Sequence, residues 1–446
     1  MKKALFLVLL ISLCACTTKD NVSYQNDTKY ENSYILNLSN NTATLDGKEV
    51  KEFDYVWNLD INDEDEYYTG QEPDKSLTTY ISHDIIYYPQ IEESLFSKQE
   101  YDGETEWVAY HTSDNLKQYA FGTLPVTGEN IPLEMMHTKE EAYNNPVIHI
   151  NKAGTYILEG EWHGQVWIDL SNSYEDNDEN QKVTLVLNDV DIKCDVAPAL
   201  VFYKVYEADS NWENKDIYTN VVNLENAGAK IIIADNSINN ITGSNVYRLL
   251  KPTYKKENNT VQKKRYKYDS AVYSCQSLLI DGEEKGTGIL NITSTTFEGL
   301  DSELHLTINN GNINIVSQDD GINVNEDDVS VFTMNGGRLT IFAAQGSEGD
   351  VIDSNGFIKI NGGTILGCTP SMSDEILDSN NGTDVSENAI IISCSSKNNF
   401  VPEMPQGENS MRPNKFEPRN FDDKNFNPND FDPNNKPEPK EFPKQN

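Results

Sequence analysis

The chain has 446 residues, of which 72 are Asp or Glu and 35 are Lys or Arg, so its formal charge is −37 at pH 7. A chain of this length can bury a large core, and a charge of this sign repels DNA, RNA and bare acidic membrane surfaces at long range. Nucleic acid is therefore excluded as a partner, whereas cations and ligands bridged by cations are favoured.

The first 16 residues have the pattern of an export signal. Two lysines precede an apolar run that ends at Leu13, and this run is shorter than the roughly 20 residues of a membrane-spanning helix. Ala15 and Cys16 fit a bacterial lipobox, in which a small residue precedes the cysteine that becomes lipidated; a simple secretory signal is the alternative. We therefore predict a lipoprotein signal peptide over residues 1–16, lipidation at Cys16, and an extracytoplasmic protein anchored to the membrane at the cell surface.

The next two segments carry little periodic signal. Residues 17–33 are polar and are expected to form a disordered tether. Strand signals begin at Tyr34, but the stretch from 58 to 145 is irregular, aromatic and acidic. We therefore predict an N-terminal β-rich or irregular region over residues 34–146, whose role stays open.

A repeat predicts the fold of the following part of the chain. Gly311, Gly337 and Gly363 recur every 26 residues, each beside a short segment in which apolar and polar residues alternate. A period of this length indicates stacked repeats, and the short β-branched segments make the unit a strand. We predict an all-β fold with a parallel β-helix (solenoid) over residues 147–396. Residues 397–446, rich in Asn, Pro, Phe and Asp, are predicted to form a disordered tail.

The cysteines beyond the leader contain no CxxC pair and have no neighbouring histidine that would suggest a zinc site. We expect them to fill the core. Export permits one disulfide, but the spacing does not choose its partners. These residues are Cys194, Cys275, Cys368 and Cys394.

Acidic turns follow the repeated strands and suggest a cation site. Equivalent positions in successive rungs lie about 4.8 Å apart, where like charges repel by roughly 1 kcal/mol in water and roughly 3 kcal/mol in a partly buried site. Ca²⁺ relieves such repulsion and takes its oxygen ligands from Asp, Asn and backbone carbonyls. The alternative is that Asp and Asn are present only because they favour turns. The candidate ligands are Asp301, Asp319, Asp320, Asn323, Asp350, Asp353, Asn355 and Asp378.

Three segments of the sequence resemble motifs of a known family. They are Asp269 to Ser274, Asp319 to Ile322, and Gly349 to Gly356. Over roughly residues 145–370 the chain is similar to bacterial surface proteins described as carbohydrate-binding domain-containing, whose β-helix is related to family nine polysaccharide lyases. The resemblance implies a right-handed helix, bound calcium, and affinity for cellulose and pectate-like acidic polysaccharide. The calcium-ligand role carries over to the matching positions Asp319, Asp320, Asp350 and Asp353.

The chain also departs from this family. Val351 stands where the family usually has a glycine, so we expect its side chain to narrow one approach to the acidic turns. The long insertion between about Asp195 and Ile231 is a second departure.

A catalytic function would need more than the acidic turns. A lyase acting on uronates requires a cation to hold the carboxylate and a base, often Lys or Arg, to remove a proton. Lys285 and Lys359 lie near the repeats, but Lys359 stands in an alternating strand, where an outward and solvated side chain is the ordinary arrangement. We therefore expect no catalysis, and uronate polysaccharide lyase is kept as an alternative.

A binding function asks for a flat face, stacked polar side chains and aromatic platforms for sugar rings. We predict calcium-dependent, non-catalytic binding of pectate-like or cellulosic polysaccharide by a monomer, with Ca²⁺ bridging the carboxylates of protein and uronate. The other alternative is a structural or adhesive surface scaffold that calcium only stiffens. The candidate platforms are Trp162, Trp167, Tyr203, Trp212 and Tyr273.

Overall fold

The computed structural model describes residues 30–40, 42–60, 65–87, 96–101, 104–109, 137–171, 177–209, 219–246, 268–344, 349–369, 374–395 and 401–402. The chain divides into residues 1–403 and 404–446, and the second unit lies wholly outside the described residues. The predicted signal peptide with Cys16, most of the tether, Trp212 and nearly all of the tail also lie outside them. No helix within the described ranges is long and apolar enough to cross a membrane.

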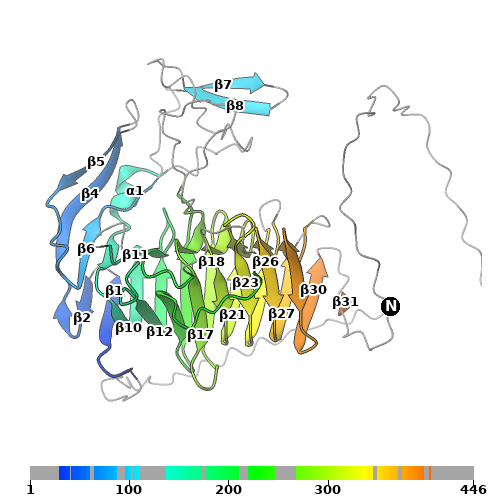
Figure 1. The fold of residues 1–446 in the computed structure, drawn as a ribbon. Coiled ribbons are helices and arrows are strands. Elements are labelled where there is room, and N and C mark those ends of the chain that lie inside the picture. The colour runs from blue at the N-terminus through cyan, green and yellow to red at the C-terminus, as the bar shows by residue number, and fades with distance from the viewer. Residues whose placement is uncertain are drawn as a thin grey trace, which may run out of the picture. The chain divides into compact units, whose positions relative to one another are not determined.

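The repeats form three ladders of short parallel strands, and three consecutive strands, one from each ladder, make one rung (Figure 1). The first ladder contains β9 (Val147–Ile150), β11 (Gln165–Asp169), β13 (Leu200–Lys204), β16 (Ser270–Ser274), β19 (Glu298–Ser302), β22 (Ile322–Val324), β25 (Ile352–Ser354) and β28 (Asp378–Ser379). The second contains β14 (Ala229–Ile233), β17 (Leu278–Gly282), β20 (Leu306–Ile308), β23 (Val331–Met334), β26 (Phe357–Ile360) and β29 (Gly382–Val385).

The third ladder contains β15 (Ile238–Gly243), β18 (Ile289–Ser294), β21 (Asn312–Val316), β24 (Arg338–Phe342), β27 (Gly363–Thr369) and β30 (Ala389–Ser395). The long strands β10 (Gly154–His163) and β12 (Val183–Lys193) run through both the second and the third ladder. From β16 to β27 each strand pairs in parallel with the strand three places later in the chain. The all-β prediction is confirmed, and the arrangement is that of a solenoid.

Strands from the N-terminal region extend these sheets. β1 (Tyr34–Asn40) pairs in parallel with β10 and leads into β2 (Thr42–Leu45) and β3 (Lys48–Glu49). β6 (Thr79–His83) pairs antiparallel with β9, so the first ladder continues through β6 to β4 (Glu52–Asp60) and β5 (Asp65–Gly70) and becomes a mixed sheet. The remaining elements are β7 (Phe96–Tyr101), β8 (Glu104–Ala109), the helix α1 (Lys139–Tyr143) and β31 (Val401–Pro402).

Large and small residues alternate inside the stack between the first and the third ladder. A Cβ atom on Gly321 would lie 2.2 Å from the side chain of Ile341, so this rung has room for only one large residue. In the next rung the sizes are reversed: Val351 follows Gly321, and Gly367 follows Ile341 in register. A Cβ on Gly367 would lie 2.8 Å from Val351, which is fully buried. The expectation that Val351 narrows access to the acidic turns is therefore wrong, because its side chain fills the core.

The cysteines do not share one role. Cys194 and Cys275 are buried thiols, as expected of core residues. Cys368 and Cys394 instead form a disulfide between in-register positions of β27 and β30, with Cα atoms 4.7 Å apart. The expectation that every cysteine fills the core is wrong for this pair, which joins the last two strands of the third ladder.

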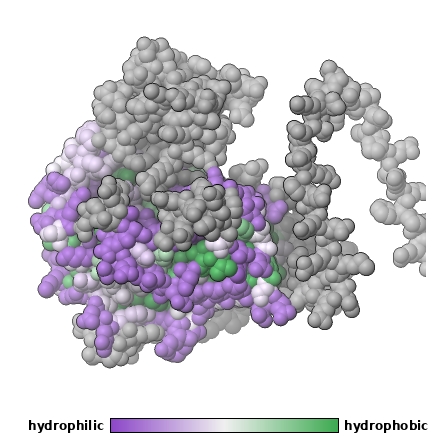
Figure 2. Space-filling view, viewed as in Figure 1, coloured by the Kyte–Doolittle hydropathy of each residue, from purple (hydrophilic) through white to green (hydrophobic). Residues whose placement is uncertain are grey.

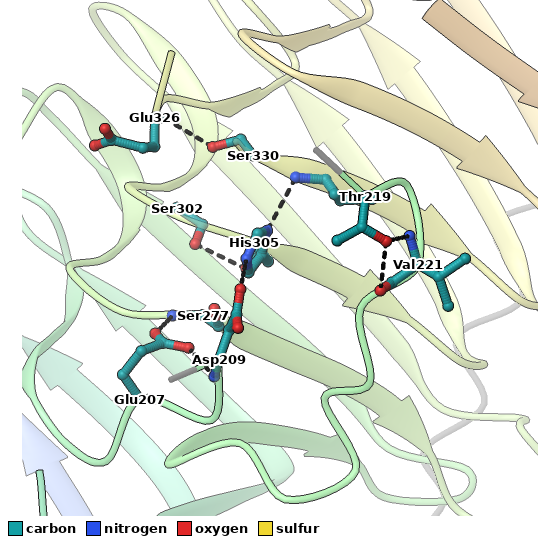
Figure 3. Close-up of polar contacts among 10 residues, drawn as sticks. Glu207, Asp209, Thr219, Val221, Ser277, Ser302, His305, Glu326 and Ser330 are labelled. Atoms are coloured by element: carbon teal, nitrogen blue, oxygen red, sulfur yellow. Dashed lines mark hydrogen bonds and ion pairs between the residues drawn. The ribbon is translucent and has the colours of Figure 1, made fainter. Parts of the chain in front are cut away.

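A buried polar cluster ties the insertion after β13 to the ladders (Figure 3). Glu207 accepts hydrogen bonds from the backbone N–H groups of Ser277 (2.7 Å) and Asp209 (2.8 Å), and burial raises its pKa. Nδ1 of His305 accepts from the N–H of Val331 at 3.0 Å, so the ring proton resides on Nε2, which faces a carboxylate oxygen of Asp209 at 3.1 Å. The insertion is thereby anchored directly to two successive rungs, at Ser277 and His305, and through His305 to Val331 of the third.

Candidate functional site

Polar side chains form one column on the outer face of the first ladder. Tyr273, Asp301, Asn323, Asp353 and Asp378 occupy the same register position in β16, β19, β22, β25 and β28. Because strand residues alternate between faces, this column lies opposite the buried apolar column of the same strands. Its members run from fully buried at Asp301 to exposed at Asp378, and we call Asp301, Asn323, Asp353 and Asp378 the acid column.

The buried end of the acid column contains an unpartnered oxygen. Both carboxylate oxygens of Asp301 accept hydrogen bonds from the side-chain amide of Asn325, at 2.9 and 2.8 Å. Asn323, only 4 % exposed, has a buried Oδ1 with no hydrogen-bond partner. A buried polar atom without a partner costs about 1–3 kcal/mol, so its retention suggests a ligand absent from the structure. Carboxylates of Asp301 and Asp353 flank it in register.

A second acidic group lies in the turns that precede β22 and β25. The backbone N–H of Asp350 donates to Oδ1 of Asp320 at 2.6 Å, and that of Glu375 donates to Oδ1 of Asp350. Burial, followed by the negative charges of Asp319, Asp353 and Asp350, raises the pKa of Asp320 to about 8. The pKa of Asp350 is also raised, first by burial and then by neighbouring carboxylates. We call Asp319, Asp320, Asp350 and Glu375 the acidic turns. Ionisation of Asp320 and Asp350 is therefore unfavourable without a cation.

Asn355 takes a different position from the other predicted ligands. Its side-chain amide donates to the backbone carbonyl of Asn325 at 2.8 Å, and the amide of Asn380 donates to the carbonyl of Asn355 at 3.3 Å. These bonds join successive corners of the stack. The structure therefore places Asn355 beside the acid column, in a ladder of corner amides, rather than in the column.

The oxygen donors suit a hard cation, although they do not form a ready-made centre. No group of three or more His, Cys, Asp or Glu side chains among the described residues could hold a metal ion. Ca²⁺ tolerates such a site because it takes six to eight oxygens that include amides, backbone carbonyls and water. The unpartnered Asn323 Oδ1 is one such oxygen, so the residues present fit calcium by chemistry.

An aromatic groove lies on the same face, toward the N-terminal end of the first ladder. The outer column continues in register through Trp167 on β11, His149 on β9 and Tyr80 on β6. These residues line a cavity of about 420 Å³ together with Tyr55, Tyr68, Tyr203 and Tyr268, and we call this cavity the aromatic groove.

The rings of the aromatic groove stack in pairs. Trp167 and Tyr203 have ring centroids 4.8 Å apart, with planes inclined by 28°. The rings of Tyr55 on β4 and Tyr68 on β5 are nearly parallel, with centroids 4.9 Å apart and planes inclined by 4°. Both pairs are partly or largely exposed, so aromatic faces border the groove at two places separated by β6 and β9.

Charged side chains complete the groove. Asp84, Asp169 and Lys75 line it, and Nε2 of His149 lies 2.9 Å from Oδ1 of Asp84. Burial raises the pKa of Asp84, but the electrostatic interaction with His149 and hydrogen bonds from His149 and Ser82 outweigh burial and lower the pKa, so Asp84 is ionised at neutral pH. Ser82 contacts the same ring nitrogen and is fully buried. In a catalytic triad the acid and the nucleophile contact different ring nitrogens of the histidine. Here Asp84 and Ser82 both contact Nε2 of His149, so this cluster is not a triad.

The predicted aromatic platforms differ in their exposure. Trp167 and Tyr203 line the aromatic groove, whereas Trp162 is 1 % exposed in the core and presents no face to a ligand. Tyr273 is also fully buried, with its ring against Tyr268. Trp162 and Tyr273 are thus unsuitable as platforms, and Trp212 lies outside the described residues.

Sequence reasoning missed the contribution of the N-terminal strands to the groove. Tyr55, Tyr68 and Tyr80 come from a region with no repeat, and only its aromatic composition hinted at a role.

The comparisons with known proteins address the whole ladder region. A family model described as "Carbohydrate-binding domain-containing protein" matches residues 144–415, which is more than half of the chain. The chain belongs to this family. No curated protein and no solved structure matches it. The family segment contains the acid column and Trp167 with Tyr203, whereas Tyr55, Tyr68 and Tyr80 precede it.

Proposed function

We propose that the protein binds polysaccharide on the outer face of the first ladder, that this binding depends on calcium, and that it involves no catalysis. The observation that carries the proposal is the register column that contains Trp167 of the aromatic groove at one end and, beyond the fully buried Val201 and Tyr273, Asp301 and the rest of the acid column. Membership of a carbohydrate-binding domain family supports it. The oxygen donors of the acid column suit a chain with anionic substituents, and the aromatic rings at the other end of the column suit uncharged pyranose faces.

Specific residues would hold the ion. The side-chain oxygens of Asn323, Asp353 and Asp320 are the donors we assign, because the first is unpartnered and the others carry charges that repel one another. Calcium would supply positive charge there, which would offset these carboxylates and attract the carboxylates of a pectate-like chain. Asp350 orients Asp320 through the backbone hydrogen bond described above. A neutral cellulosic chain would instead rely on the aromatic rings.

Further features belong to the same proposal. We take the stack to be a right-handed parallel β-helix and the protein to be a monomer, lipidated at Cys16 and held outside the cytoplasm. The disulfide between Cys368 and Cys394 supports export, because disulfides persist in oxidising compartments. Lys359 lies in register between Thr333 and Asp384 on the second ladder, away from the acid column, which supports a non-catalytic role.

A retention assay tests the proposal. The purified full chain is applied to pectate gel and to insoluble cellulose, with calcium and with excess chelator. We expect retention on pectate in calcium, release by chelator, and at least tenfold weaker retention of Asp320→Asn. Asp327→Asn, which removes an exposed charge outside the acidic turns, is the matched control and should behave like the wild type. Equal retention in chelator would contradict the calcium dependence.

A structural scaffold is the second candidate, and one observation favours it. Asp320 and Asp350 each accept a backbone N–H from the next rung, so these carboxylates already act within the stack. If calcium only stiffens the stack, chelator lowers the melting temperature but leaves retention on polysaccharide unchanged at temperatures where the fold persists. Circular dichroism beside the retention assay distinguishes the two.

A further inference from the structure

We infer that the aromatic groove is a separate site for a neutral glycan and that it works without calcium. This inference deepens the proposed function and rests on it, because it assigns a ligand class to one end of the proposed binding face. The groove and the acid column differ in their chemistry, and each would therefore select a different part of a polysaccharide.

The geometry of the groove suits sugar rings. The Trp167–Tyr203 pair and the Tyr55–Tyr68 pair present aromatic faces to one cavity of about 420 Å³. Pyranose rings carry apolar C–H faces that pack on aromatic rings, and binding sites of this size combine such faces with a few polar groups. Between the pairs the ring of Tyr80 stacks on His149 at 4.4 Å.

The polar groups of the groove favour hydroxyls over carboxylates. Asp84 and Asp169 both line it, and Lys75 is the one lysine or arginine among its described lining residues. The excess of acceptor carboxylates repels a uronate but accepts hydrogen bonds from sugar hydroxyls. Burial and the charges of these two aspartates raise the pKa of Tyr80, so its hydroxyl stays protonated.

Calcium has no evident role in this groove. Its described lining contains two carboxylates, Asp84 and Asp169, and no third acidic side chain. Asp84 is already engaged by the ring of His149, at 2.9 Å, and by the hydroxyl of Ser82. The acid column begins three register steps after Trp167, or roughly 14 Å at the usual strand spacing, so an ion bound there does not reach the groove.

Binding of neutral oligosaccharides in excess chelator tests the inference. Cellotetraose, xylotetraose and mannotetraose are titrated into the full chain by calorimetry, with tryptophan fluorescence as a second readout. We expect at least one to bind in chelator with an affinity that calcium leaves unchanged, and trigalacturonate to bind at least tenfold more weakly there. Binding of none of the three, or only in the presence of calcium, would overturn the inference.

Matched variants locate the site. Tyr68→Ala removes a groove ring that is 46 % exposed, whereas Tyr67→Ala removes its neighbour, 48 % exposed, which does not line the groove. We expect at least tenfold weaker binding of the neutral sugar for Tyr68→Ala and for Trp167→Ala, and no change for Tyr67→Ala. Equal binding by all three would place the sugar elsewhere and overturn the inference.

Different results would contradict the calcium-dependent function and the neutral-glycan site. Retention on calcium pectate should survive Tyr68→Ala and be weakened by Asp320→Asn, while neutral sugar binding should show the opposite pattern. If pectate is retained but no neutral sugar binds, the inference is wrong and the calcium-dependent function stands. If a neutral sugar binds in chelator but pectate is never retained, the calcium-dependent function is wrong and the groove site stands.

Discussion

Asp320 accepts a hydrogen bond from the backbone N–H of Asp350, one rung further along the stack, at 2.6 Å. Burial, followed by the negative charges of Asp319, Asp353 and Asp350, raises the pKa of Asp320 to about 8. This carboxylate therefore links two rungs and at the same time destabilises them whenever it ionises without a counter-charge.

The first prediction concerns pH. Asp320 has a pKa of about 4 in the unfolded chain and about 8 in the folded chain, so between these values the folded chain holds a proton that the unfolded chain releases. In chelator, the free energy of unfolding should therefore fall as pH rises from 4 to 8, by about 1 kcal/mol per pH unit from this group. Urea unfolding at several pH values measures it. Asp320→Asn should flatten the slope, and an unchanged slope would contradict the assignment.

The second prediction concerns the unpartnered amide oxygen. Asn323→Leu removes a buried polar group without a partner, so in chelator it should leave stability unchanged or raise it by about 1 kcal/mol. In calcium the same variant should lose most of the calcium-dependent rise in melting temperature, because a ligand oxygen is gone. Asn291→Leu is the control: it breaks side-chain bonds to Asn240 and Asn314, both 2.9 Å, and should destabilise equally in either condition. An undiminished calcium effect in Asn323→Leu would exclude this residue as a ligand.

The third prediction concerns the reversed pair of large and small residues. Val351→Gly opens a cavity in the core and should cost about 2–3 kcal/mol, and Gly367→Ile alone overpacks the same space and should cost about 1–3 kcal/mol. The double variant reproduces the arrangement of Gly321 with Ile341 in the preceding rung, so its cost should fall at least about 1 kcal/mol below the sum. Additive costs in urea unfolding would show that the two side chains do not share one space.

The fourth prediction concerns the last rungs. The disulfide between Cys368 and Cys394 closes a segment with a sequence separation of 26, and its removal should cost about 3 kcal/mol. The loss should be local, so hydrogen exchange should accelerate in β27 to β30 after replacement of both cysteines by serine. Replacement of the free, buried Cys194 by alanine is the comparison and should not accelerate exchange selectively in these strands.

The solenoid was accessible from sequence because its signals are local. Gly311, Gly337 and Gly363 all adopt positive φ, at 112°, 78° and 88°, and a fixed spacing of such positions with alternating strands between them predicts stacked rungs. The acidic turns were accessible for the same reason. Which oxygen lacks a partner depends on the packing around Asn323, and no spacing rule reports that.

The aromatic groove could not be predicted from the sequence, for a physical reason. Tyr55 and Tyr68 meet Trp167 only because β6 pairs antiparallel with β9, a contact between distant segments without a repeat. Trp162 shows the converse: a tryptophan in an alternating strand gives no indication of which face is buried, and here the core takes it.

The pairing of β6 with β9 also affects which parts of the groove can vary in evolution. The family segment begins at residue 144 and supplies Trp167, Tyr203 and the acid column, while Tyr55 and Tyr68 arrive on separate N-terminal strands. Substitutions of the partly or largely exposed Tyr55 and Tyr68 can reshape one border of the groove, because the strands of the stack do not carry these side chains. One border of the groove is thus encoded outside the segment that forms the stack, so ligand preference can change there while Trp167, Tyr203 and the acid column stay the same.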